Sequence, residues 1–378
     1  MISGVDARRR FAIAPDLNLL NHGSYGSCPR EVLASQQAWR DAMEADPIAF
    51  MEAAPARLRD VVSQVAPRLG AQPEDLALVE NATTGVSAVL RSLTFKPGDR
   101  LVTTSHVYGA VRNAMRWVAE RAGATVVEVP VPWPVESPEQ VVAALTAALP
   151  GARLVVLDWI TSPTGMVWPI EAMVRACQRE GVPVLVDAAH APGHVPMDLD
   201  ALGADWTTGN LHKWMFAAKG TAVLHVRKDR QAEIVPLAIS HDLDRGFPLS
   251  FDQPATRDLS SWLSTPAALA FIDELGQANL QAHNNALCAR LADELADMWG
   301  VSLPTPPSMR AALATLPTPG DVPAERAPWL HAALQGRRIE VPCVPFAGRT
   351  WMRISAQVYN HPDEYRALGR AVRELLND

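Results

Sequence analysis

One lysine in this 378-residue sequence stands in a setting that suits amine chemistry. The chain contains only four lysines, which are Lys96, Lys213, Lys219 and Lys228. Lys213 follows a predicted strand and is flanked by His212 and Trp214, whereas the other three lie in predicted turns, loops or charged strand exits. A partly desolvated amine has a lowered pKa, so Lys213 is the best candidate for a nucleophile or a base.

A carboxylate ends the most apolar predicted strand of the chain. Asp187 closes the run 182–187, and a carboxylate buried at that point is costly unless it meets a cation or hydrogen-bond donors. A pyridinium nitrogen, a metal ion or a neighbouring arginine would each satisfy it. His190 follows three residues later, close enough in the sequence to hydrogen-bond or stack in the same site.

The segment 80–85 joins a predicted strand to the start of a helix and contains Asn81, Thr83, Thr84 and Gly85. Free backbone N–H groups and the helix dipole make such a position suitable for an anion. The same residues also fit a simple helix cap made by Asn81 or Thr83. An anion site, a strand-end carboxylate and a desolvated lysine together match pyridoxal 5′-phosphate (PLP), whose phosphate, ring nitrogen and aldehyde carbon are each held separately.

The elements around these residues alternate between strand and helix. Strands are predicted at 76–80, 100–104, 125–131, 153–160, 182–187, 204–208 and 221–226, and helices at 84–93, 107–122, 138–149 and 169–180. Apolar strands separated by helices indicate an α/β fold with a mainly parallel sheet covered on both faces. Ligands bind at the carboxyl ends of the strands in such sheets, which is where Asp187 and Lys213 are expected.

The chain divides into three parts by this pattern. Residues 1–20 are predicted to form an N-terminal arm, residues 21–240 a large PLP-binding domain, and residues 241–378 a small C-terminal α+β domain. Within the last part, long helices are predicted over 265–299, followed by a proline-rich connection over 303–319 and a C-terminal strand–helix pair.

Composition excludes several classes of protein. A net charge of −7 without long basic runs argues against a nucleic-acid or anionic-membrane partner. Neither an apolar stretch long enough to span a bilayer nor a signal-peptide pattern is present. Four scattered cysteines without a C-x-x-C pair predict reduced thiols and a cytoplasmic location. We assign no metal-binding residues.

Four short motifs resemble one known family in their order along the chain. They are the stretches 81–85, 187–190, 212–213 and 353–360, and together they resemble the class V aminotransferase group of fold-type I PLP enzymes. The stretch 20–29, with 161–165 and 256–258, is similar to the isopenicillin N epimerase-like branch, which also contains ergothioneine-pathway C–S lyases. The resemblance covers nearly the whole chain; it is specific for fold and cofactor but not for substrate.

The resemblance implies roles for the central residues. Lys213 holds PLP as a Schiff base and then moves the Cα proton of the substrate, while Asp187 pairs with the pyridinium nitrogen. Tyr108 is expected to stack on the ring and to assist with a proton, with His106 as the second choice for stacking. The remaining cofactor-binding residues implied are Thr83, Thr84, Gly85, Ser162, His190, Asn210 and His212.

The resemblance also implies partners and substrate contacts. Thr256 is expected to reach the phosphate of a neighbouring subunit, which predicts a homodimer with shared sites. Arg353 is expected to bind the α-carboxylate of an amino-acid substrate, a task that suits the fork of a guanidinium. The residues Asn21, His22 and Tyr25 are placed at the substrate entrance, although turn capping and packing explain them equally well.

One departure from a related group concerns cysteine. Cysteine desulfurases need a nucleophilic cysteine on a mobile loop well before the carboxylate-binding arginine. Here Cys343 lies only ten residues before Arg353, in an apolar run that predicts a strand, and Cys28 near the expected entrance has no basic neighbour. Both observations argue against persulfide chemistry.

The reaction itself stays open at this level. Once the Cα proton is lost, β-elimination, epimerisation and transamination are all accessible to a PLP enzyme. We favour β-elimination from a cysteine S-conjugate or sulfoxide, giving pyruvate and ammonia, because Tyr108 and the segment 21–26 are shared with the C–S lyases. Epimerisation is the second choice, aminotransferase or desulfurase activity ranks lower, and intact Lys213, Asp187 and Arg353 argue against an inactive scaffold.

Overall fold

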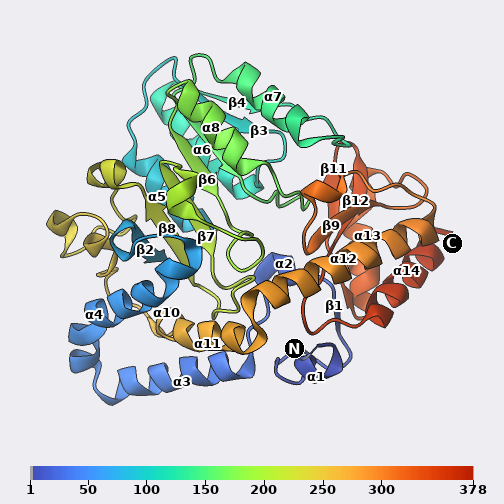
Figure 1. Cartoon of the computed structure of the whole chain (residues 1–378), viewed down its shortest axis with the longest axis horizontal. Helices are drawn as coiled ribbons and strands as arrows, with labels where there is room; N and C mark the ends of the chain where they lie inside the picture. Colours follow the sequence, from blue (N-terminus) through green and yellow to red (C-terminus); the bar gives the residue numbers. More distant parts are fainter. Residues whose placement is uncertain (1–2, 378) are drawn as a thin grey trace.

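A seven-stranded sheet lies at the centre of the larger part of the molecule, as seen in a computed structural model that describes residues 3–377 (Figure 1). The strands of the chain are β1 (Asn18–Leu19), β2 (Leu76–Val79), β3 (Arg100–Thr104), β4 (Thr125–Val129), β5 (Leu154–Asp158), β6 (Val184–Asp187), β7 (Trp206–Asn210), β8 (Ala222–Val226), β9 (Leu313–Pro317), β10 (Ile339–Glu340), β11 (Cys343–Phe346) and β12 (Arg349–Ser355). The large sheet has the order β2-β8-β7-β6-β5-β3-β4, and within it β8 alone runs antiparallel to its neighbours. The expected mainly parallel α/β sheet is confirmed.

Helices cover both faces of this sheet. The helices are α1 (Val5–Arg8), α2 (His22–Tyr25), α3 (Arg30–Ala45), α4 (Pro47–Val65), α5 (Ala82–Ser92), α6 (Gly109–Ala122), α7 (Pro138–Ala148), α8 (Ile170–Arg179), α9 (Leu199–Leu202), α10 (Ser260–Leu263), α11 (Thr265–Leu275), α12 (Gln277–Trp299), α13 (Ala327–Gly336) and α14 (Pro362–Asn377). Strand β5 shows how the two layers share the sheet: Leu154 and Val156 join the core under α5 and α6, while Val155 and Leu157 join the core under α4, α7 and α8. A strand buried on both faces explains the continuous apolar run in the sequence.

A second, antiparallel sheet of order β11-β12-β9 lies toward the C-terminus and packs with α12, α13 and α14 around a separate core (Figure 1). Strand β1 pairs in parallel with β10, so the N-terminal segment is joined to this part of the chain. Helices α10 and α11 pack against α3 and α4 beside the large sheet. The division of the chain at residues 20 and 240 remains a prediction.

The proline-rich connection predicted over 303–319 is wrong in one respect, because it contains strand β9. Three prolines precede this strand and Pro317 ends it. Because prolines are typical of loops, the sequence pattern did not indicate a strand here. Strand β9 lies at the edge of its sheet, where a missing backbone N–H is tolerated. Its position matters because Thr315 on β9 pairs with Arg353 on β12.

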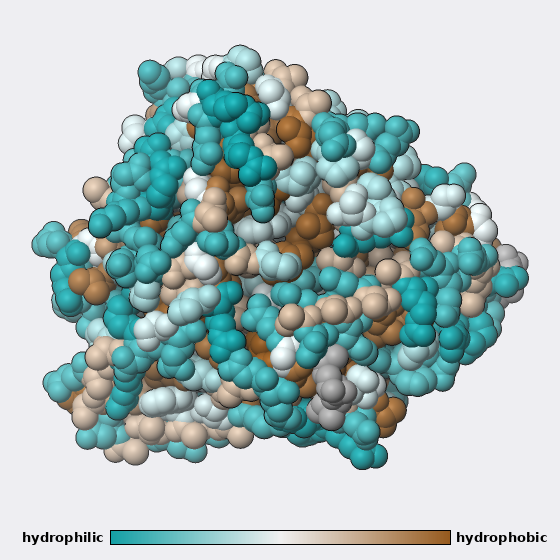
Figure 2. Space-filling model, viewed as in Figure 1, coloured by the Kyte–Doolittle hydropathy of each residue, from teal (hydrophilic) through white to brown (hydrophobic). Residues whose placement is uncertain are grey.

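The surface drawn in Figure 2 is mostly hydrophilic, with apolar residues scattered in small groups. Within the described residues, we find no helix with both the length and the apolar character that crossing a bilayer requires.

Candidate active site

A cavity of about 680 Å³ opens at the carboxyl ends of the parallel strands, as expected for this class of sheet. Its walls come from the residues after β2, β5, β6 and β7, from α2 and from β12. The predicted site residues on its wall are Tyr25, Thr83, Tyr108, Ser162, Asp187, His190, Asn210, His212, Lys213 and Arg353. Asn81, Glu80, Asp158, Ser24 and Lys219 line it as well.

Lys213 follows β7 and points its amine into the cavity, with Nζ 3.3 Å from Nε2 of His190. Burial lowers the pKa of Lys213 to about 7, and the positive charge of Arg353 acts in the same direction while Asp187 opposes it. A substantial fraction of the amine is therefore neutral near neutral pH, as a nucleophile or a general base requires.

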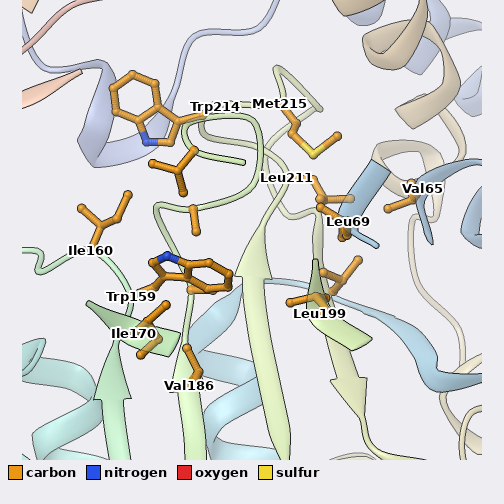
Figure 3. Packing of buried hydrophobic residues seen from close by; sticks show 14 of the residues in the cluster. Val65, Leu69, Trp159, Ile160, Ile170, Val186, Leu199, Leu211, Trp214 and Met215 are labelled. Carbon is orange, nitrogen blue, oxygen red and sulfur yellow. The ribbon is translucent and has the colours of Figure 1, made fainter. Parts of the chain in front are cut away.

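The loop that carries Lys213 is fixed by packing of its neighbouring side chains in the interior. Leu211, Trp214 and Met215 of this loop are part of the packed interior (Figure 3), and Trp214 stacks on the ring of His194 with centroids 3.9 Å apart. The predicted entrance residue His22 is also buried here, with Nε2 2.9 Å from the carbonyl oxygen of Lys213. The sequence placed His22 at the entrance, but in the structure it lies behind the lysine loop.

The ring of His22 is neutral, because burial lowers its pKa to about 3. Its Nε2–H therefore donates to the carbonyl oxygen of Lys213. Its Nδ1 accepts a hydrogen bond from the hydroxyl of Tyr359, and these two atoms lie 2.9 Å apart. The neighbouring turn packs equally tightly, since a Cβ at Gly26 would collide with the carbonyl oxygen of His212. The N-terminal segment thus fixes the position of the reactive lysine.

We expect the Lys213 amine of the cofactor-free protein to react with an acylating reagent with a pH midpoint of about 7, because burial favours its neutral form. Peptide mass mapping across a pH series measures the reaction at Lys213, with exposed Lys228 as the internal reference. A midpoint near the ordinary lysine value of 10.5 would show that the amine is solvated.

Two buried carboxylates face the cavity from neighbouring strands. Asp187 ends β6 and accepts a hydrogen bond from the backbone N–H of Ala189 at 2.9 Å. Asp158 ends β5 directly opposite it in the register, and the sequence reasoning missed this residue. The Oδ2 atom of Asp158 is buried without a hydrogen-bond partner among the described residues. Burial and the charge of Asp187 raise the pKa of Asp158 well above its usual range.

Adjacent buried carboxylates cannot both ionise at low cost, so the pair shares one charge. Burial raises the pKa of both groups, but the N–H of Ala189 and the charge of Lys213 favour the ionised form of Asp187. Oδ2 of Asp158 has no such donor among the described residues, so we assign the proton to Asp158 and the negative charge to Asp187. A buried, charged Asp187 needs a cationic partner in the cavity. The protonated ring nitrogen of PLP fits that requirement.

The start of α5 offers a place for a phosphate. Asn81 caps the backbone N–H of Thr84 at 2.9 Å, and the side-chain oxygen of Asn210 accepts from the N–H of Ala82 at 2.8 Å. The N–H of Thr83 lies between them without a partner among residues 3–377. His212 binds the carbonyl of Thr221 through Nδ1, at 2.9 Å, and lines the same end of the cavity. The unpartnered N–H of Thr83, at the start of a helix, fits the phosphate of PLP.

Three residues predicted to bind the phosphate lie elsewhere in the described chain. Thr84 is turned away from the cavity, with its hydroxyl 3.3 Å from Asn81. Gly85 serves packing, because a Cβ there would collide with the side chain of Thr208 on β7. Thr256 is exposed outside the cavity, and its contact with a neighbouring subunit remains a prediction.

Arg353 reaches the cavity from the second sheet. It is buried on β12, and its guanidinium donates to the backbone oxygen of Ser162 and, at 3.2 Å, to the hydroxyl of Ser24. Its Nε is buried without a partner among the described residues, and burial lowers the pKa of Arg353 to about 10. A buried arginine with spare donors is suited to a carboxylate ligand.

Some of the remaining predicted site residues line the cavity, and the others lie outside it. Tyr108 directly precedes α6 on the cavity wall and is 42% exposed, and Tyr25 on the same wall is exposed as well. His106 is buried among aromatic rings and does not line the cavity, so it is not positioned to stack on a ligand there. Asn21 lies outside the cavity wall and donates to Glu340 at 3.1 Å.

The cysteines show no sign of a reactive thiol. Cys28 and Cys343 both lie outside the cavity wall. Burial raises the pKa of the Cys343 thiol to about 12 and that of Cys28 to about 12 as well. A thiol in this state is a poor nucleophile.

Comparison with known proteins agrees with this geometry. A family model for aminotransferase class-V matches residues 28–367. The chain belongs to the class-V aminotransferase family. The L-cysteine desulfhydrase of Arabidopsis thaliana is 30% identical over 95% of this chain and 88% of its own length. The isopenicillin N epimerase of Amycolatopsis lactamdurans is also 30% identical, over 98% of both chains.

The fold is shared with solved structures. The apo structure of the cysteine desulfurase of Thermococcus onnurineus superposes with a TM-score of 0.82 and 20% identity, covering 100% of this chain and 99% of that one. The family and the fit of Lys213, Asp187 and the start of α5 identify the chain as a PLP-dependent enzyme.

Proposed function

We propose that this enzyme is a C–S lyase that eliminates the sulfur substituent of a cysteine S-conjugate or sulfoxide. The observation that carries the proposal is the partly buried Lys213 amine, with a pKa of about 7, in the same cavity as the buried guanidinium of Arg353. One residue can remove a proton from Cα while the other holds the α-carboxylate. Similarity to an L-cysteine desulfhydrase supports sulfur as the leaving group.

We assign a separate role in the reaction to each of three residues of the cavity wall. Arg353 binds the substrate carboxylate, and Ser24 and Ser162 hold the guanidinium in place. Asp187 keeps the ring nitrogen of the cofactor protonated. When bound, PLP withdraws electrons from Cα and so weakens the Cα–H bond. Lys213, with its neutral amine, then takes that proton.

Elimination breaks the bond between Cβ and sulfur. The proton from Cα goes to the Lys213 amine, and sulfur leaves with its bonding electron pair as a thiolate or, from a sulfoxide, as a sulfenate. Tyr108 on the cavity wall donates a proton to the leaving sulfur. Hydrolysis of the remaining three-carbon fragment by water gives pyruvate and ammonia.

Epimerisation is the second candidate, because an isopenicillin N epimerase matches almost the whole chain. It requires an acid–base group on the face of the substrate opposite Lys213. Tyr108 is the residue of the cavity wall that we assign to this task if the enzyme epimerises. The two candidates share every step up to removal of the Cα proton.

The test is to incubate the holoenzyme with S-substituted L-cysteines and their sulfoxides and to measure pyruvate. We expect pyruvate from at least one of them, with loss of the signal when Lys213 is replaced. Absence of pyruvate from all of them, with continuing Cα–H exchange in D₂O, would refute the lyase and favour the epimerase.

We expect the substitution Arg353→Lys to raise KM about 10- to 100-fold, the effect of losing hydrogen bonds to a charged group. The effect on kcat should be smaller, because Arg353 binds a group that does not react. Steady-state kinetics measure both constants. Arg349→Lys, on the same strand but outside the cavity, is the matched control and should leave KM unchanged.

We also propose a cytoplasmic homodimer. The exposed Thr256 and the exposed aromatic rings of Tyr25 and Tyr108 on the cavity wall support a second subunit at this face. The four free thiols support a reducing compartment. Sedimentation analysis of the holoenzyme tests the dimer, which a monomer at all concentrations would contradict.

A further inference from the structure

A second hollow, of about 290 Å³, adjoins the active-site cavity. Tyr108, Ser162 and Arg353 line both spaces, so the two meet at the point where Arg353 is proposed to hold the substrate carboxylate. An S-linked group on a substrate fixed at this junction has room to extend into the second hollow. A bare thiol, as in cysteine itself, would leave it filled with water.

Apart from the residues shared with the active-site cavity, the hollow has mainly apolar walls. They are formed by Val107, Pro163, Pro342, Val344, Pro345 and Phe346. Phe346 is held by other rings, with centroid distances of 4.7 Å to His106 and 5.7 Å to Trp133. A wall of packed rings and prolines is pre-formed, so an apolar group can bind there without ordering flexible side chains first.

A second cation, besides Arg353, lines the same hollow. Arg112, on α6, donates through Nε to Glu128 at 2.8 Å. Its two terminal nitrogens make no hydrogen bond within the part of the chain that the structure describes, and its side chain is 31% exposed. The terminal guanidinium is therefore available to an anionic group bound in this hollow.

From this arrangement we propose that the second hollow binds the sulfur substituent of the substrate. The preferred substrates are cysteine S-conjugates in which sulfur carries an apolar or aromatic group that ends in a carboxylate. The apolar walls bind the body of the substituent, and Arg112 binds its end. This inference rests on the proposed C–S lyase activity and deepens it by naming the substrate class.

Three substrates that differ only in the substituent test the proposal: S-methyl-, S-benzyl- and S-(4-carboxybenzyl)-L-cysteine. For the holoenzyme we expect kcat/KM to rise about 100-fold from S-methyl to S-benzyl, as for apolar groups that fill a pocket. A further rise of about tenfold is expected for the carboxybenzyl compound, because hydrogen bonds to a charged group are among the stronger ones. Equal values, or a preference for S-methyl, would overturn the assignment of the hollow.

Substitutions test which residues produce the preference for benzyl over methyl and the preference for carboxybenzyl over benzyl. Arg112→Gln should abolish the preference for carboxybenzyl over benzyl, whereas Arg116→Gln, an exposed arginine one turn along the same helix, should preserve it. Val344→Phe, which fills the hollow, should abolish the preference for benzyl over methyl. An unchanged preference in Arg112→Gln would show that the guanidinium does not face the substituent.

A binding measurement separates this inference from the proposed reaction. Dissociation constants of the three compounds are measured from the visible absorbance of the holoenzyme, without reliance on turnover. If the order of affinity holds but no pyruvate forms, the hollow binds the substituent and the lyase proposal fails. If pyruvate forms from all three compounds but their dissociation constants are equal, the proposed lyase activity is supported and the hollow does not bind the substituent.

Discussion

Replacing Lys213 by alanine is expected to abolish turnover and the covalent attachment of PLP. A positioned general base contributes about 10²- to 10⁴-fold to a rate. The loss here should reach or exceed the upper end of that range, because the same amine also anchors the cofactor. Pyruvate formation and the visible absorbance of the purified variant measure the two effects separately.

The control for this experiment is another lysine on the same cavity wall. Lys219 lines the cavity, but it is exposed and follows a different turn of the chain. Lys219→Ala should therefore retain the attached cofactor and measurable turnover. If Lys213→Ala still carried covalent PLP while Lys219→Ala did not, the roles of the two lysines would have to be exchanged.

The second large effect is expected for Asp187→Asn. An amide in place of the buried carboxylate cannot keep the ring nitrogen protonated, and it leaves the cation unpaired. Breaking a buried ion pair costs about 3–5 kcal/mol, so kcat should fall by about 10²- to 10⁴-fold. The affinity for PLP should fall as well, which dialysis against cofactor-free buffer measures.

Asp158→Asn is the matched comparison, because Asp158 occupies the equivalent position on the neighbouring strand. Burial and the charge of Asp187 raise the pKa of Asp158, so this carboxyl is already neutral and an amide imitates it closely. Only a few-fold change in kcat is expected. If Asp158→Asn were the more damaging of the two, the negative charge would belong to Asp158 rather than Asp187.

The sequence predicted the parts of the site that depend on local pattern. Strand β3 begins and ends where the apolar run predicted, and Asp187 and Lys213 follow their strands at the edge where ligands bind. A parallel sheet brings the ends of its strands together whatever the order of the strands. The lysine, the carboxylate and the start of α5 were therefore expected to meet before the order of the strands was known.

The parts that escaped prediction depend on which segments become neighbours. Asp158 faces Asp187 only because β5 lies beside β6, and no local signal distinguishes it from an ordinary strand-end carboxylate. His22 looked like an entrance residue, yet the pairing of β1 with β10 turns it toward the back of the lysine loop. Gly85 looked like part of an anion site, but the close approach of α5 to β7 requires it for packing.

The most direct test of the account is to map where PLP is attached. The holoenzyme is reduced with borohydride, digested, and the peptide that carries the pyridoxyl mass is sequenced by mass spectrometry. We expect one modified residue, Lys213. Modification at Lys219 or another lysine, or purified protein that binds no PLP, would contradict this expectation.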